Sequence, residues 1–234
     1  KSRHEISDIA AIKPLLTTSE LMVRVNPWNE NYKREIDEVI NSGAGIIMLP
    51  YWKSVDEVKN FLYAVDKRVK TILLLETKQA VQCIDEVLTL DFDEIHIGLN
   101  DLHLSYGLTF MFEPLVNGTV ETLCEKFKCK GIPFGFGGIA RLGQGMLPSE
   151  EVIMEHYRIG STRAILSRSF CNINECNGDL ETIEKLFSEN MRELREYEKV
   201  CQKASWDVLN KNRIKVIKDI DEIVRTLGKK RHEA

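Results

Sequence analysis

The chain has 234 residues, of which 43% are hydrophobic, enough to bury the core of one of the larger α/β domains. Its net charge of −4 comes from acids and bases mixed along the sequence, so no basic patch predicts a nucleic-acid or membrane partner. Apolar runs are far below the ~20 residues of a membrane helix, and no leader is evident. The six cysteines are dispersed rather than densely paired, which favours a reducing, cytoplasmic location.

Strand-like and helix-like segments alternate along most of the chain. After a short helix within residues 6–14, we expect strands that begin near Leu21, Gly45, Thr71, Glu94, Phe134 and Thr162. We expect helices over residues 32–41, 54–65, 78–90, 120–127 and 149–157 between or after them. Regular alternation of strand and helix predicts a parallel sheet, and polar residues at its strand ends suit a TIM-like barrel.

Two carboxylates follow neighbouring buried strands of the predicted sheet. Glu76 comes directly after the apolar run Ile72–Leu75, and Asp101 lies in the loop that follows the strand Glu94–Leu99. The helix expected over residues 78–90 would connect the two strands as a β-α-β unit. Because the carboxyl ends of parallel strands meet at one face, these carboxylates are candidate site residues.

Two further segments offer positive charge or backbone N–H groups to an anion. Arg24 ends the first apolar strand, where a guanidinium requires either an acidic partner or an anionic ligand. The segment Phe134–Gly145 is rich in glycine but matches neither nucleotide-binding glycine motif. It is either a loop shaped by tight turns or a substrate-lining loop, in which Gly137, Gly138 and Arg141 would contact the ligand.

These motifs together resemble the metal-dependent HpcH/HpaI aldolase and citrate lyase β-subunit family. The resemblance lies in Glu76-Thr77 after a strand and in Gly98-Leu99-Asn100-Asp101-Leu102 with Gly107 a few residues on. The segments LMVRVNP at 21–27 and GAGIIMLPYWKSVDEV at 43–58 fit the same family in the right order. The resemblance covers most of residues 20–170 and becomes weak after them.

The resemblance implies a TIM-like (β/α)8 barrel, an α/β fold, here without the two strands that precede the Arg24 strand in the family. It implies Mg²⁺ or Mn²⁺ held by Glu76 and Asp101, with Arg24 as the catalytic residue at the keto oxygen of the substrate. The backbone of Gly98, Leu99 and Asn100 would bind the carboxylate of the substrate. The family's proton-transfer group would lie on the two absent strands, and His96, His103 and His156 are weaker candidates.

Three functions are compatible with these residues. The first is a metal-dependent aldolase that cleaves or forms a C–C bond of a small 4-hydroxy-2-keto acid through a pyruvate-type enolate, with an aldehyde as the other partner. The second is a citrate-lyase-like enzyme that cleaves a CoA thioester and has a pocket for the CoA nucleotide. The third is a non-catalytic metabolite-binding or scaffold protein with a metal pair but no base.

The last part of the chain is predicted to be helical and to follow the barrel as a separate unit. We therefore divide the chain into a barrel, residues 1–170, and C-terminal helices, residues 171–234. The helices carry two apolar stripes, which are Leu180, Ile183, Leu186, Phe187, Met191, Leu194 and Tyr197 in one and Ile217, Ile220, Val224 and Leu227 in the other. These exceed what one barrel requires, so the helices are expected to pack on the barrel or on a neighbouring subunit of a homo-oligomer, a dimer or hexamer.

Overall fold

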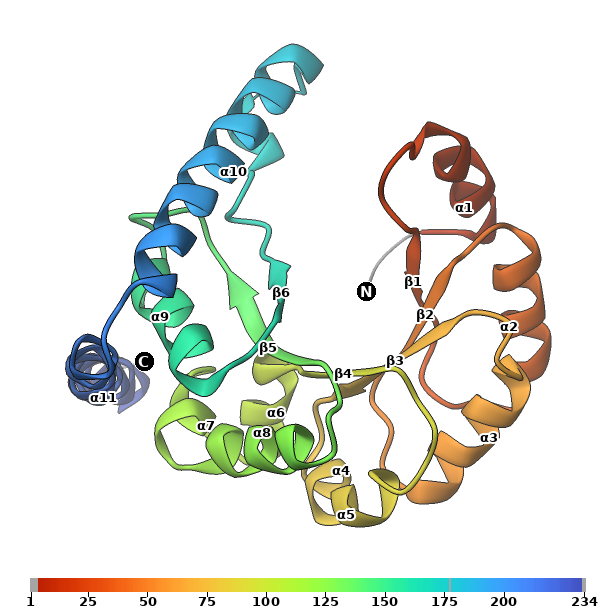
Figure 1. Cartoon of the computed structure of the whole chain (residues 1–234), viewed down its shortest axis with the longest axis horizontal. Coiled ribbons are helices and arrows are strands. Elements are labelled where there is room, and N and C mark those ends of the chain that lie inside the picture. Colours follow the sequence, from red (N-terminus) through yellow and green to blue (C-terminus); the bar gives the residue numbers. More distant parts are fainter. Residues whose placement is uncertain (1–3, 177, 233–234) are drawn as a thin grey trace.

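Six parallel strands form one curved sheet at the centre of the computed structural model, which describes residues 4–176 and 178–232. The strands are β1 (Met22–Arg24), β2 (Ile46–Leu49), β3 (Lys70–Leu75), β4 (Glu94–Ile97), β5 (Phe134–Ile139) and β6 (Arg163–Leu166). Their order in the sheet is their order in the sequence, and each pairs in parallel with the next. The predicted parallel α/β sheet is therefore confirmed, and Figure 1 shows its curvature.

Helices connect the strands and cover the outer side of the curve (Figure 1). Helices and 3-10 turns are α1 (Ile6–Ile12), η1 (Lys13–Leu15), α2 (Tyr32–Asn41), α3 (Val55–Val65), α4 (Lys78–Gln82), α5 (Ile84–Val87), α6 (Leu99–Ser105), α7 (Glu113–Val116), α8 (Thr119–Cys129), α9 (Ser149–Ile159), η2 (Ile173–Cys176), α10 (Leu180–Gln202) and α11 (Trp206–His232). Repeated strand and helix units build this layer, because a parallel connection needs a crossover long enough to hold a helix.

The strands contribute to core clusters on both faces of the sheet because successive strand residues point to opposite faces. Leu73 and Leu75 of β3 belong to the main cluster, which joins the sheet to the outer helices. Ile72 and Leu74 form a second cluster with Met48, made of strand residues alone, on the inner side of the curve. This burial on both faces explains why the parallel strands read as continuous apolar runs in the sequence.

The sheet is open, because within the described residues neither β1 nor β6 pairs on its outer edge. All four residues of β6 are exposed, and so are Met22 and Arg24 of β1. Figure 1 shows the opening between these two strands. The described part of the chain is therefore a six-stranded half-barrel, consistent with a TIM-like barrel, and a closed barrel is not formed by these residues.

Two local predictions differ from the structure. The helix expected over residues 78–90 is divided into α4 and α5 at Cys83, where the backbone leaves helical geometry (φ −103°, ψ 12°) while Ala80, Ile84 and Val87 all remain buried. The strand expected to run to Leu99 ends at Ile97. Its continuation is the short helix α6, which begins after Gly98, so Asp101 lies in a helical turn rather than in an open loop.

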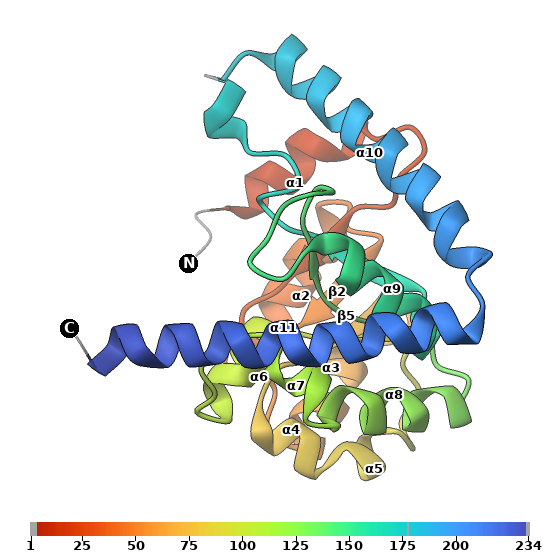
Figure 2. The same cartoon turned by 90° about the vertical axis from the view of Figure 1, so that its left-hand side faces the viewer.

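The C-terminal helices pack on the outside of the half-barrel. Helix α11 lies against α7 and α9, with Val216 and Ile220 fully buried, and Figure 2 shows it running across the view, along the direction in which Figure 1 sees it end-on. Helix α10 packs on α9 through Leu194, but its first turns leave Leu180 and Phe187 79% and 43% exposed. The apolar stripe of α10 is therefore only partly covered by the described residues.

Candidate active site

Glu76 is held at the carboxyl end of β3 by the segment that follows β2. Its side chain is only 4% exposed, and Oε1 accepts a hydrogen bond from the Tyr51 backbone N–H at 3.0 Å. Tyr51 adopts a left-handed conformation (φ 56°), unusual for a bulky residue. Next to Glu76, the Thr77 hydroxyl donates to the Trp52 carbonyl at 2.8 Å and caps α4. The Glu-Thr pair is thus fixed between β3 and the β2–α3 connection.

Asp101 is brought beside this carboxylate by a close approach of two backbones. It lies in the first turn of α6, directly after Gly98 at the end of β4. A Cβ atom on residue 98 would lie 2.8 Å from Glu76 Oε2 and 2.9 Å from Glu76 Cβ, which is closer than atoms pack. The glycine that begins the Gly-x-x-Asp motif is therefore required by the position of Glu76.

The electrostatics of Glu76 link three of the predicted site residues. Burial, which is the largest cause, and the nearby negative charge of Asp101 raise the pKa of Glu76 to about 7. The Tyr51 N–H bond and the Arg24 guanidinium act in the opposite direction and lower this pKa. Arg24, the last residue of β1, is exposed rather than buried in the sheet. The structure thus brings two carboxylates and one guanidinium within electrostatic range of each other.

The donor set at this place fits a divalent cation of the Mg²⁺ or Mn²⁺ type. Within residues 4–176 and 178–232 no three His, Cys, Asp or Glu side chains are arranged to hold a metal, so a site here has two protein carboxylates, Glu76 and Asp101. Such ions prefer oxygen ligands and commonly use one or two carboxylates, with water and substrate oxygens at the other positions. Two like charges beside each other in a buried setting favour a cation between them.

The glycine-rich segment is a strand with a bulge and only then a loop. Strand β5 continues past Phe136 to Ile139, and Gly137 has a positive φ of 59°. A Cβ atom on residue 137 would lie 3.0 Å from Leu99 Cδ1, so this glycine packs against the start of α6. Gly138 follows in the strand, and the half-buried Arg141 lies in the loop before α9, where its carbonyl accepts from the Ser149 hydroxyl at 2.8 Å.

All three histidines considered from the sequence are buried. His96 Nε2 bonds to the Gly137 carbonyl at 2.9 Å, and burial lowers the pKa of this histidine to about 4. His156 bonds to the Ser161 hydroxyl at 2.8 Å, and burial lowers its pKa to about 3. His103 Nδ1 lies 3.3 Å from the Leu99 carbonyl. His96 and His156 are thus neutral residues of the interior rather than proton donors open to a ligand.

The sequence did not indicate the role of Tyr51, whose backbone N–H contacts Glu76. The only signal was its place directly after Pro50 at the end of a buried strand, where loops contribute to sites. Arg24, Glu76, Asp101 and residues 98–100 gather at the carboxyl ends of β1, β3 and β4, while Gly137, Gly138 and Arg141 follow in and after β5. Asn100 is exposed in α6, and Leu99 is buried beneath it.

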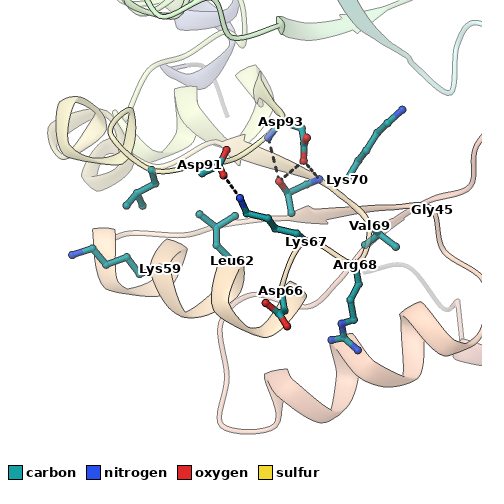
Figure 3. A pocket seen from close by; sticks show the side chains of 12 residues that line it. Gly45, Lys59, Leu62, Asp66, Lys67, Arg68, Val69, Lys70, Asp91 and Asp93 are labelled. Atoms are coloured by element: carbon teal, nitrogen blue, oxygen red, sulfur yellow. Dashed lines mark hydrogen bonds and ion pairs between the residues drawn. The ribbon is translucent and has the colours of Figure 1, made fainter.

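A surface pocket of about 810 Å³ lies at the opposite, amino-terminal end of the strands (Figure 3). It contains none of the predicted site residues. Part of its charged lining is paired within the pocket, since Lys67 contacts Asp91 at 2.6 Å and Asp93 accepts hydrogen bonds from the Thr71 backbone and hydroxyl at 2.8 Å. In α/β barrels this end of the strands serves stability rather than chemistry, so the pocket is separate from the candidate site.

Comparison with known proteins supports the interpretation of these motifs. Residues 1–112 match the model of the HpcH/HpaI aldolase/citrate lyase family. This range includes β1 to β4 and therefore Arg24, Glu76 and Asp101. The resemblance to this family that the sequence motifs indicated is confirmed. A comparison with curated proteins found no match.

Solved structures share the fold at low sequence identity. An HpcH/HpaI aldolase from Desulfitobacterium hafniense DCB-2 is 16% identical, with a TM-score of 0.58 over 78% of this chain and 80% of that chain. An HpcH/HpaI aldolase/citrate lyase family protein from Burkholderia cenocepacia J2315 is 16% identical, with a TM-score of 0.58 over 77% and 81%. RipC from Yersinia pestis is 15% identical, with a TM-score of 0.54 over 72% and 76%. The similarity therefore extends through the fold beyond residue 112.

Proposed function

From its match to the HpcH/HpaI aldolase/citrate lyase family, we propose that this chain is a divalent-metal-dependent aldolase. The proposed substrate is a small 4-hydroxy-2-keto acid, which is split into, or formed from, a 2-keto acid such as pyruvate and an aldehyde. The family supports the coarser statement that the chain is a lyase. We propose the metal and the substrate class from the residues that gather at the strand ends.

One observation carries the proposal, which is that Glu76 is buried beside a second carboxylate without a bonded cation among the described residues. A buried acid is normally paired, because an unpaired charge away from water is costly. Here the Tyr51 backbone N–H is the hydrogen-bond partner of the carboxylate, and the nearby Asp101 carboxylate raises its pKa. Such an arrangement is typical of a functional site rather than of a structural ion pair.

The residues have separate tasks in the proposed reaction. Glu76 and Asp101 would hold the ion, which when bound supplies a Lewis acid that polarises the keto group of the substrate. The Arg24 guanidinium would stabilise the negative charge that develops on the keto oxygen as the C3–C4 bond breaks and its electron pair enters the enolate. The Gly98 N–H donates to the Leu75 carbonyl at 2.9 Å, so the backbone N–H groups of Leu99 and Asn100 would bind the substrate carboxylate, and the loop that carries Arg141 would cover it.

Proton transfer requires a group beyond these residues. The hydroxyl at C4 must lose a proton and C3 must gain one, and the buried histidines of the half-barrel are poorly placed for either step. We propose that two further strands close the sheet between β6 and β1, as in an eight-stranded barrel, and bring this group to the mouth. The outer edges of β1 and β6, which are unpaired within the described residues, and the exposure of both strands support this closure.

Assembly as a homo-oligomer is supported by the apolar residues that α10 leaves exposed, among them Leu180 and Phe187. We propose at least a dimer, located in the cytoplasm, and light scattering at micromolar concentration tests the first part. A monomer at that concentration would contradict it. Among the described residues, no helix combines the length and the apolar composition needed to cross a membrane.

The decisive experiment measures Mn²⁺ binding by calorimetry for the full-length protein and two variants, Glu76→Gln and Asp101→Asn. Each variant keeps the shape of the side chain but removes the charge that offsets the cation, so affinity should fall by about a hundredfold or more. Glu86→Gln, an exposed acid of α5, is the matched control and should bind like the parent. Parent-like binding by both site variants would place the metal elsewhere and overturn the proposal.

Arg24→Ala separates substrate chemistry from metal binding. Its guanidinium is assigned to the substrate oxygen, so Mn²⁺ affinity should remain close to the parent while turnover falls by about a hundredfold. The assay is pyruvate release from 4-hydroxy-2-keto acids. The parent protein is also assayed with a CoA thioester of a dicarboxylic or hydroxy acid. Cleavage of the thioester alone would favour the citrate-lyase-like alternative, and metal binding without either activity would favour a binding or scaffold role.

A further inference from the structure

Strand β5 contains one residue more than β6 over the same stretch of the ladder. Gly135 pairs with Arg163 and Gly138 pairs with Ile165, so the β5 backbone bulges between Gly135 and Gly138. Gly137 lies at this bulge with a φ of 59°. A carbonyl group displaced from the ladder and buried from water needs another donor, because an unpaired buried carbonyl is costly.

His96 supplies that donor from the neighbouring strand. It pairs in register with Leu74 on one side and with Gly135 on the other, which places it on the inner face of the curve with Leu74. Only 4% of it is exposed, and its Nε2 lies 2.9 Å from the Gly137 carbonyl oxygen. Because a carbonyl only accepts, this contact assigns the proton to Nε2.

The bulge is in turn packed against the candidate active site. The position of a Cβ on Gly137 is 3.0 Å from Leu99 Cδ1, and Leu99 is the first residue of α6. The preceding residue, Gly98, lies against Glu76, and Asp101 follows within the same helical turn. A shift of the β5 backbone would therefore change the positions of both proposed metal ligands and of the loop that leads to Arg141.

We propose that His96 is a positioning residue, which fixes the β5 bulge by donating from Nε2 to the Gly137 carbonyl and so sets the geometry of the site loop. Its part in catalysis rests on the proposed function, whereas its hold on the bulge does not. Gly135, which pairs in register with His96, and Gly137 at the bulge carry no side chains, and the His96 imidazole bonds there as a rigid neutral donor.

The experiment compares His96→Leu, which removes the donor, with His96→Gln, which keeps an N–H group at similar reach. Hydrogen exchange of peptides covering residues 134–147 is measured by mass spectrometry on the full chain, together with kcat and KM. The control is Asn212→Leu in α11. It removes another buried side-chain donor, which bonds to the Glu151 backbone carbonyl at 3.0 Å. Gly137→Ala tests the bulge independently, should His96→Leu fail to fold.

In His96→Leu and in Gly137→Ala, exchange over residues 134–147 should quicken by about tenfold or more, since a buried carbonyl loses its partner. KM should rise more than kcat falls, and the effects of the two changes should not add. His96→Gln should recover most of both properties, and Asn212→Leu should change neither. Unchanged exchange in both His96→Leu and Gly137→Ala would overturn the inference, as would failure of Gln to rescue. An inactive parent protein would refute the proposed function. The hydrogen-exchange result would still test whether His96 fixes the β5 bulge.

Discussion

Two buried glutamates of this molecule differ in how their negative charge is compensated. Glu155 of α9 is fully buried and lies 2.9 Å from Arg158 Nη2 and 3.5 Å from Arg213 Nη1, so two arginines from two helices surround it. Glu76 is buried almost as deeply, but its bonded partner is a backbone N–H, and the nearby charge of Asp101 opposes its ionisation more strongly than the Arg24 guanidinium favours it. The first arrangement is complete within the chain, and the second is not.

The difference separates a structural charge from a functional one. Glu155, Arg158 and Arg213 join α9 to α11, and Arg158 also reaches Glu121 of α8 at 2.7 Å, so this network holds three helices together. Glu76 stabilises no neighbour in this way, and the elevated pKa shows that its ionised form is disfavoured where it lies. Under the proposed function, a cation from outside the chain would compensate this charge.

The largest effect is expected where the compensated network is broken. Arg158→Ala leaves Glu155 buried with the more distant Arg213, so the free energy of unfolding should fall by about 3–5 kcal/mol. Urea denaturation measures it. The matched control is Arg195→Ala. The Arg195 side chain is 63% exposed, so its ion pair with Glu198 should contribute less than about 1 kcal/mol. Equal stability of the two variants would show that the network is not structural.

Glu76→Gln should stabilise the metal-free protein, whereas Arg158→Ala should destabilise it. Because the folded-state pKa is raised, ionised Glu76 destabilises the fold above its pKa of about 7, and the penalty disappears as pH falls below the unfolded value. The neutral amide should therefore raise the free energy of unfolding by about 2 kcal/mol near pH 8 and by nearly nothing near pH 4. Urea denaturation in chelator at both pH values checks this. Destabilisation at the higher pH would mean that Glu76 is compensated after all.

Gly98→Ala should strain the contact that brings the two carboxylates together. The added methyl group meets Glu76 Cβ at 2.9 Å and Leu74 Cδ1 at 3.3 Å, so we expect a loss of about 1–3 kcal/mol and weaker Mn²⁺ binding. Gly45→Ala is the control, because a Cβ there meets nothing within 4 Å. Thermal unfolding and calorimetry compare the pair. If the two substitutions cost the same, the close approach at Gly98 is not a constraint.

The smallest expected effect is the pH dependence of Mn²⁺ binding. Binding requires ionised Glu76, whose pKa lies near 7, so Mn²⁺ affinity should fall by about tenfold for each pH unit below this value. Calorimetry between about pH 5.5 and 7.5 in two buffers of different ionisation enthalpy also detects the proton that is released. An affinity that stays constant over this range would show that Glu76 is already ionised or is not a ligand.

The sequence was sufficient to predict the sheet because its strands are buried on both faces. The runs Ile46–Leu49 and Ile72–Leu75 read as continuous apolar segments, and the position of Glu76 at the end of the second identified the mouth. Contacts between backbones distant in sequence were not predictable. No local pattern encodes the Tyr51 N–H bond to Glu76 or the close approach at Gly98, because both depend on how neighbouring strand ends meet.

The C-terminal helices show the same limit in another form. The spacing of apolar residues in α10 correctly predicted a helix with an apolar face, but periodicity does not say what covers that face. Leu194 is buried against α9, while Leu180, at the other end of the helix, is exposed. Likewise, the histidines were recognised as interior residues or candidate bases, and only the fold shows that His96 bonds to a bulge in the next strand.

The strictly sequential order of the strands has a consequence for how the chain reaches its structure. Each strand pairs only with its successor, so every sheet contact joins neighbouring units, and no pairing within the described residues has to wait for the two ends to meet. Loop-closure entropy is therefore small at each step, and the units can assemble one after another from any starting point. Joining β6 to β1 would be the most distant event in the chain, so a barrel closed in this way should acquire its rim last.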